Sequence, residues 1–143
     1  MASDGETGLD MLRRMMIDEI EMPIFSLVGF NLISIDEGTV TFEFKPSKEH
    51  YNLVGTVHGG IIATIINSSM ECAVRSRLDA NTSSTIIETN INYVRPVTSR
   101  VGLMHCDGRV TTIGPRVAMT RAEMTDRRGS TYAYGTGICL VNR

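Results

Sequence analysis

A glycine-rich stretch near the middle of the chain carries residue types that could bind and polarise a carbonyl group. It places Asn52, Gly55, His58, Gly59 and Gly60 close together, directly before a mostly apolar run. Glycine lets a backbone turn tightly or approach another group closely. If a helix begins at the last two glycines, their N–H groups have no partner in that helix and lie at its positive dipole end. Such donors could stabilise the oxyanion that forms when a carbonyl carbon is attacked.

The apolar run, residues 61–74, predicts a buried helix. Its apolar side chains fall on several faces of a helix, and a helix of this kind must be surrounded by other elements. Read as a strand, the run would be far too long. It is also too short, and too often interrupted by Asn, Ser and Glu, to span a bilayer, so we expect no membrane partner.

The segments around this helix predict an antiparallel sheet. Residues 9–22 show a helical apolar repeat that ends at Pro23. Residues 30–35 and 39–45 flank a turn and are typical of a hairpin. Strand-like runs joined by short connections follow at residues 85–94, 100–112, 115–125 and 130–141. Because such strands pair with their neighbours and only one helix can fill the space inside, we expect an α+β fold: a curved antiparallel sheet wrapped around one long central helix, plus an N-terminal helix.

Composition excludes several classes of protein. The chain has 143 residues, a formal net charge of -2 and no basic run, so nucleic acid is not an expected partner. No HExxH, P-loop or dinucleotide-binding motif is present, and we expect no metal and no cofactor. The cysteines form no CxxC pair and, with no signal peptide evident, indicate reduced structural thiols in a cytoplasmic protein; they are Cys72, Cys106 and Cys139.

Three features together resemble the hotdog-fold thioesterases of the phenylacetate-degradation (PaaI-like) type. They are the run 52–60 with its His-Gly-Gly element, the helix behind it, and the segment Asn90-Ile91-Asn92-Tyr93-Val94-Arg95-Pro96. The resemblance implies a hotdog domain over residues 25–143, preceded by an N-terminal tail and helix in residues 1–24. It also implies hydrolysis of an acyl-CoA thioester by a homodimer or a dimer of dimers, with active sites between subunits.

The resemblance implies an oxyanion hole at Gly59 and Gly60 and a catalytic carboxylate nine residues after the histidine, a position that Asn67 occupies here. A neutral amide can orient water or the thioester but cannot accept a proton. Glu71 lies one helical turn later on the same face. We expect Glu71 to act as the base while Asn67 positions the water or the thioester. The alternative is an ion pair between Glu71 and Arg75, which has the favourable order on a helix.

Two polar residues of the loop have two interpretations each. His58 is either a catalytic acid–base group or, as is more usual for a lone histidine, structural. Asn52 either polarises the substrate carbonyl or fixes the conformation of the loop. Both are candidate catalytic residues on the resemblance.

The remaining candidates would bind substrate. Val57 and Gly59 lie in the loop, and Ile86 stands where the resemblance implies a small hydroxyl residue beside the catalytic group. Arg95 and Arg116 are expected to contact the phosphates of coenzyme A, because a guanidinium suits such oxygens.

Helix geometry places a condition on this chemistry. Nine residues of helix separate His58 from Asn67 by roughly 13 Å along the axis, so donors at the helix start and a base in its middle must come from two subunits. The alternative function is that of a non-catalytic acyl-CoA-binding or regulatory hotdog protein that has lost its catalytic carboxylate at Asn67. A hotdog hydratase is a third, but its His–acid pattern is not found in the sequence.

Overall fold

The computed structural model describes residues 5–20 and 22–143. Within them the helices are α1 (Gly8–Ile17), α2 (Pro23–Val28) and α3 (Gly59–Arg75), and the strands are β1 (Phe30–Asp36), β2 (Thr39–Phe44), β3 (Ser83–Tyr93), β4 (Met104–Ile113), β5 (Val117–Thr125) and β6 (Thr131–Asn142). Short 3-10 helices lie at η1 (Lys48–His50) and η2 (Ser99–Val101). The described strands form one antiparallel sheet in the order β1-β2-β4-β5-β6-β3.

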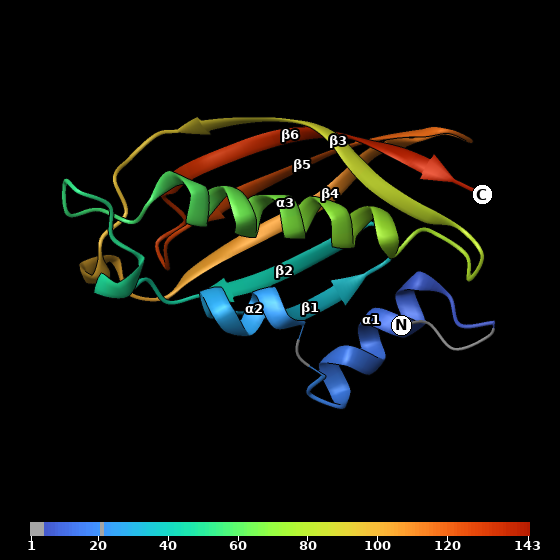
Figure 1. Cartoon of the computed structure of the whole chain (residues 1–143), viewed down its shortest axis with the longest axis horizontal. Helices are drawn as coiled ribbons and strands as arrows, with labels where there is room; N and C mark the ends of the chain where they lie inside the picture. Colours follow the sequence, from blue (N-terminus) through green and yellow to red (C-terminus); the bar gives the residue numbers. More distant parts are fainter. Residues whose placement is uncertain (1–4, 21) are drawn as a thin grey trace.

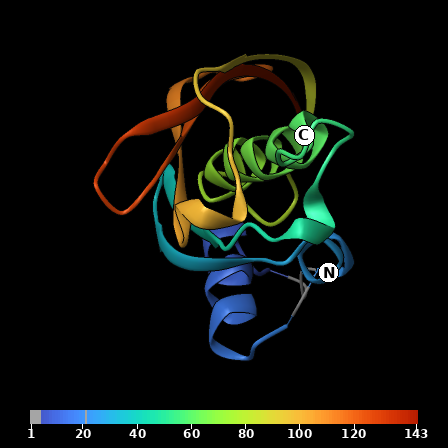
Figure 2. The same ribbon diagram turned by 90° about the vertical axis from the view of Figure 1, so that its left-hand side faces the viewer.

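The sheet curls around α3, so that β3 and β1 lie on opposite sides of the helix (Figure 1). An end-on view shows the strands enclosing α3, with the N-terminal helices below it (Figure 2). Ile65, Ile66 and Met70 of α3 are fully buried against the sheet. The helix and β4 approach so closely that a Cβ at Gly108 would lie 2.2 Å from the carbonyl oxygen of Ser69. This is the hotdog architecture that the sequence predicts.

The expected N-terminal helix over residues 9–22 is wrong in its extent. α1 ends at Ile17, and a separate short helix, α2, begins at Pro23 and ends at Val28, with Gly29 as its C-cap at a φ of 87°. Proline suits the first turn of a helix because the N–H it lacks would have no partner there. Pro23 therefore starts a helix instead of only ending one, and the predicted domain boundary between residues 24 and 25 falls inside α2.

The two edges of the sheet differ in how they are covered. α1 and α2 pack near β1, whereas no described strand lies on the free side of β3. Every residue of β3 is exposed or half-buried, and Ile87 is 59% exposed at a bulge between Ile86 and Glu88. An uncovered edge strand of this length is a surface on which another strand can pair.

Across the described ranges 5–20 and 22–143, no helix combines the length and hydropathy needed to cross a membrane.

Candidate functional site

Asn67 and Glu71 lie on the face of α3 that turns toward β3, as their spacing predicts. The hydroxyl of Thr89 donates a hydrogen bond to Oδ1 of Asn67 at 3.0 Å. The backbone N–H of Ile86 donates to the carboxylate of Glu71. The amide and the carboxylate are therefore both held by β3, beside its free edge.

The environment of Glu71 favours the protonated form of its carboxyl. Its side chain is half-buried, and this burial raises the pKa of the carboxyl, while the hydrogen bond from Ile86 acts in the opposite direction. The predicted ion pair with Arg75 is not among those of the described residues. Arg75 instead donates to the carbonyl oxygen of Thr82. Among the residues described, no cation thus forms an ion pair with Glu71, and a carboxyl with a raised pKa suits general-base chemistry.

The start of α3 offers one unoccupied backbone donor. His58 is the N-cap residue, and its Nδ1 accepts a hydrogen bond from the N–H of Gly60 at 2.8 Å. The Gly60 donor is therefore used within the chain. For the N–H of Gly59, by contrast, no acceptor is found in the part of the chain that the structure describes. The carbonyl oxygen of Gly59 does have a partner, because the hydroxyl of Tyr93 donates a hydrogen bond to it at 2.8 Å.

The capping hydrogen bond favours the structural interpretation of His58. We expect His58→Ala to lower the free energy of unfolding by about 1 kcal/mol, since a helix cap is lost, and Tm by about 3 °C. The Nδ1 that accepts from Gly60 is not free to accept a proton from water. Thermal unfolding and steady-state kinetics check this, with His105→Ala on β4 as the control. A 100-fold loss of kcat at unchanged Tm would identify an acid–base role instead.

Asn52 organises the loop that leads into α3. Its Oδ1 accepts hydrogen bonds from the N–H groups of Val54, at 3.0 Å, and Thr56, at 3.1 Å. Its Nδ2 donates to Oγ1 of Thr56 at 3.0 Å. These bonds, together with the left-handed φ of 81° at Gly55, set the turn. They favour the interpretation of Asn52 as a loop-fixing residue.

Four of the predicted site residues meet at a cavity of about 280 Å³ beside the start of α3: Asn52, Val57, Gly59 and Arg95. Val57 is buried there, and Arg95 is exposed, with its guanidinium 6.0 Å from the centroid of the Tyr132 ring. The loop and the end of β3 therefore form one surface, where an exposed cation lies near the free N–H of Gly59.

Arg116 lies at the opposite end of the sheet. The neighbouring Val117 pairs with Leu140, which in turn pairs with Thr85 near the start of β3. Eight residues of strand, or roughly 26 Å, separate Thr85 from Tyr93. Within one chain, Arg116 and Arg95 are too far apart to contact the same phosphate group.

The hydroxyl group beside Asn67 comes from Thr89, which sequence reasoning did not identify. The side chain of Ile86 packs into the core, and only its backbone N–H faces the site. The bulge after Ile86 adds one residue and so reverses the alternation of the strand. Thr89 thereby turns inward, where strict alternation from Ile86 would place it outside.

The cysteines do not take part in this site as nucleophiles. Burial raises the pKa of Cys72 and Cys106 to about 12 and that of Cys139 to about 11. All three are unpaired thiols, and the thiolate is the reactive form. Among the described residues no cluster of His, Cys, Asp or Glu could hold a metal ion.

Comparisons with known proteins bear on the family and the fold of the chain. Residues 54–133 match the model of the Thioesterase superfamily. Acyl-coenzyme A thioesterase 13 of Homo sapiens is 27% identical over 96 residues, which are 67% of each chain. The E. coli PaaI protein from the phenylacetic acid degradation operon superposes with a TM-score of 0.81 at 17% identity, over 94% of this chain and 96% of that one. smu.793 of Streptococcus mutans UA159, solved bound to acetyl CoA, has a TM-score of 0.73 at 21% identity, over 80% and 89%.

The two structural matches show a shared fold, and the family match covers more than half of the 143 residues, including the loop, α3 and β3. The chain therefore belongs to the thioesterase superfamily and has the hotdog fold that it shares with the E. coli PaaI protein.

Proposed function

We propose that the protein hydrolyses acyl-CoA thioesters to the free acid and coenzyme A. Glu71 removes a proton from a water molecule that Asn67 positions, and the water oxygen attacks the carbonyl carbon. The N–H of Gly59 stabilises the resulting oxyanion, and that of Gly60 adds a second donor when the His58 ring turns away. The intermediate then collapses as the C–S bond breaks. The leaving thiolate takes up the proton that Glu71 removed from the water molecule. The observation that carries this proposal is the half-buried carboxyl of Glu71, which forms no ion pair with any cation in the described part of the chain.

The site is shared between two subunits in this proposal. Tyr93 lies beside Gly59, and Ile86 lies beside Glu71, at opposite ends of the same strand. A two-fold axis near the middle of β3 pairs two free edges antiparallel and brings the start of one α3 to the middle of the other. The exposed Ile87 supports such pairing, because it lies on the edge that would be covered. The same axis brings Arg95 of one subunit near Arg116 of the other, where both suit the phosphates of coenzyme A.

The outer face of the sheet supports pairing of two such dimers. Arg109 lies opposite Arg121 across β4 and β5, and Asp107 lies opposite Glu123. Like charges placed directly opposite destabilise a sheet, but a second copy turned by 180° would set each arginine pair against an acidic pair. We place this tetramer in the cytoplasm, where unpaired thiols stay reduced.

Mixed dimers test the shared site. Glu71→Gln removes the base, and Gly59→Pro removes the free donor, so each variant alone should have almost no activity. Random pairing on co-expression makes half of the dimers mixed, and each mixed dimer has one intact site of two. We therefore expect the mixture to show about a quarter of the wild-type activity per subunit. If each site lies within one chain, the mixture of folded variants will be no more active than the variants alone.

The alternative function is binding of acyl-CoA without hydrolysis. It is favoured by one observation, the neutral Asn67 whose Oδ1 accepts the Thr89 hydrogen bond where a charged base could stand. Wild type that binds acyl-CoA without turnover, with turnover appearing in Asn67→Asp, would support this alternative. Turnover by wild type that depends on Glu71 supports the enzyme.

A further inference from the structure

A groove of about 520 Å³ opens beside Glu71 and runs toward the N-terminal helices. Ser68, Glu71, Cys72 and Arg75 form its wall on α3, and the mostly polar residues 80–84 line it where β3 begins. The opposite wall is apolar and comes from α1, α2 and the residue before α2; it includes Met11, Leu12, Met15, Met22, Ile24 and Phe25. The groove thus has a polar side, which carries Glu71, and an apolar wall formed by the N-terminal helices.

The size and lining of the groove favour a flexible aliphatic occupant. A water molecule takes up about 30 Å³ of liquid, so a two-carbon acyl group would leave most of the groove filled with water against apolar side chains. At its rim Met22 and Ile24 are 44% and 41% exposed, and they gain from being covered. Methionine side chains adapt to irregular shapes. The ring of Phe25 already packs against Phe30 and Phe42, with centroids 4.7 and 5.1 Å away.

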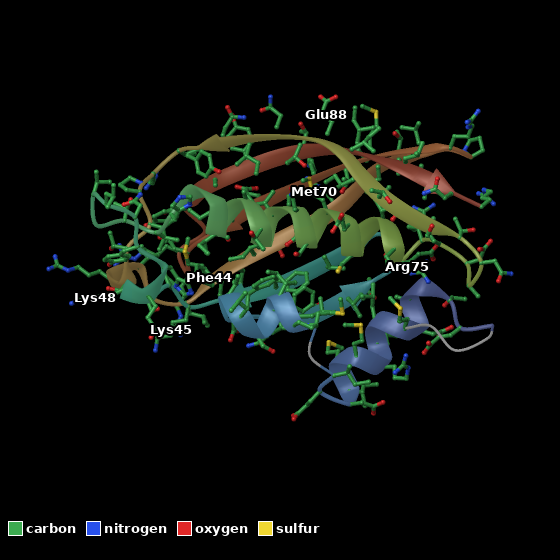
Figure 3. The ribbon with its side chains drawn as sticks, viewed as in Figure 1. Phe44, Lys45, Lys48, Met70, Arg75 and Glu88 are labelled. Carbon is green, nitrogen blue, oxygen red and sulfur yellow. The ribbon has the colours of Figure 1, made fainter. Side chains whose placement is uncertain are left out.

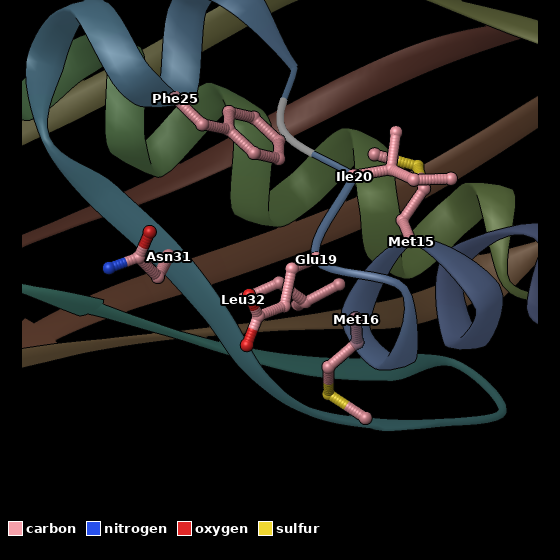
Figure 4. A pocket seen from close by; sticks show the side chains of 7 residues that line it. All are labelled: Met15, Met16, Glu19, Ile20, Phe25, Asn31 and Leu32. Atoms are coloured by element: carbon pink, nitrogen blue, oxygen red, sulfur yellow. The ribbon is translucent and has the colours of Figure 1, made fainter.

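Met15 and Phe25 lie between this groove and a second cavity. The second cavity has a volume of about 250 Å³ and lies between the end of α1, α2 and the start of β1. Figure 4 shows Met15 and Met16 on the α1 side, with Asn31 and Leu32 on the β1 side. Met15 and Phe25 line both cavities, and of these two Met15 is the flexible side chain, whereas Met16 lines only the second cavity. Shortening Met15 would therefore join the two spaces and lengthen the groove.

We infer that this groove binds the unbranched aliphatic chain of a medium- or long-chain acyl-CoA, and that Met15 sets the length of chain accepted. The inference rests on the proposed thioesterase function. With the thioester carbonyl beside Asn67 and Glu71, the chain runs between α3 and the wall formed by α1 and α2. Each methylene that enters the groove leaves water, which favours longer chains until the groove is filled.

The test measures kcat/KM for acetyl-, octanoyl-, lauroyl-, palmitoyl- and phenylacetyl-CoA in wild type, Met15→Ala and Met16→Ala. In wild type we expect kcat/KM to rise roughly fourfold per methylene from the shortest chain to the optimum. Met15→Ala should raise the ratio of palmitoyl- to octanoyl-CoA activity at least about tenfold, the effect of two further buried methylenes. Met16→Ala should leave this ratio unchanged, and Met15→Leu should retain most of the wild-type profile.

A preference for acetyl- or phenylacetyl-CoA, with the same profile in Met15→Ala, would overturn the inference and leave the thioesterase proposal intact. If wild type hydrolyses none of these esters, the proposed function fails, and the groove is tested by binding alone. S-alkyl-CoA thioethers, which cannot be hydrolysed, should then still bind more tightly with each methylene and show the same shift in Met15→Ala. Equal affinity for short and long thioethers would reject the groove as a chain site.

Discussion

Replacing Glu71 by Gln is expected to lower kcat for acyl-CoA hydrolysis by about 100- to 10,000-fold at neutral pH, the usual contribution of a positioned base. Glutamine keeps an oxygen that can accept the hydrogen bond from Ile86, but it cannot take a proton from water. Release of the coenzyme A thiol measures the rate. Glu88→Gln makes the same chemical change on β3, with a side chain that points away from α3 (Figure 3), and should retain full activity.

The pH dependence of the same variant gives a second readout. Because burial raises the pKa of Glu71, kcat of wild type should increase with pH, with an inflection above the ordinary pKa of a glutamate. The Glu71→Gln variant should lack this increase of kcat with pH. Between the ordinary and the raised pKa the folded state binds the proton more tightly than the unfolded state, so the contribution of Glu71 to stability falls as pH rises through that window. Glu71→Gln should therefore have a higher Tm than wild type at neutral pH and an equal Tm below the ordinary pKa. Unchanged kcat and an unchanged pH profile would exclude Glu71 as the base.

The main elements of the fold could be predicted from local patterns. Alternating residues predict β2 and the later strands, because a period of two decides which side chains of a strand are buried. The apolar run predicts α3, because a helix that is apolar on several faces must be surrounded by other elements. The division of the N-terminal region into α1 and α2 was not predicted. Pro23 is compatible with both the end of one helix and the first turn of the next. Only the packing of Phe25 against Phe30 and Phe42 shows which applies.

The site was predictable where helix spacing determines it and not where a strand irregularity does. Asn67 and Glu71 share a face of α3 because they are four residues apart, and residues at this spacing are neighbours on a helix. The inward position of Thr89 depends on a bulge, which no residue type in β3 marks. The use of the Gly60 N–H depends on how the His58 ring is turned, a choice among side-chain rotamers that the sequence does not specify.

Gly59→Pro is expected to lower kcat by about 100- to 1,000-fold, the effect of removing one oxyanion donor, while the fold is retained. Gly59 is the first residue of α3, where proline is well tolerated because its missing N–H would have no partner in the helix. His58 has φ -56° and ψ 131°, a conformation compatible with a following proline. The substitution thus deletes the donor without breaking a hydrogen bond of the described chain.

Gly59→Ala is the matched control for this change. A Cβ at Gly59 would lie 3.2 Å from Cζ of Tyr93, and alanine and proline both introduce this contact. Alanine keeps the N–H, so the ratio of kcat between the two variants isolates the donor from the crowding of the Tyr93 ring. We expect alanine to retain most of the activity and proline to lose it, with similar Tm values for both. Equal losses in the two variants would mean that the space beside Tyr93, and not the Gly59 N–H, is what the reaction requires.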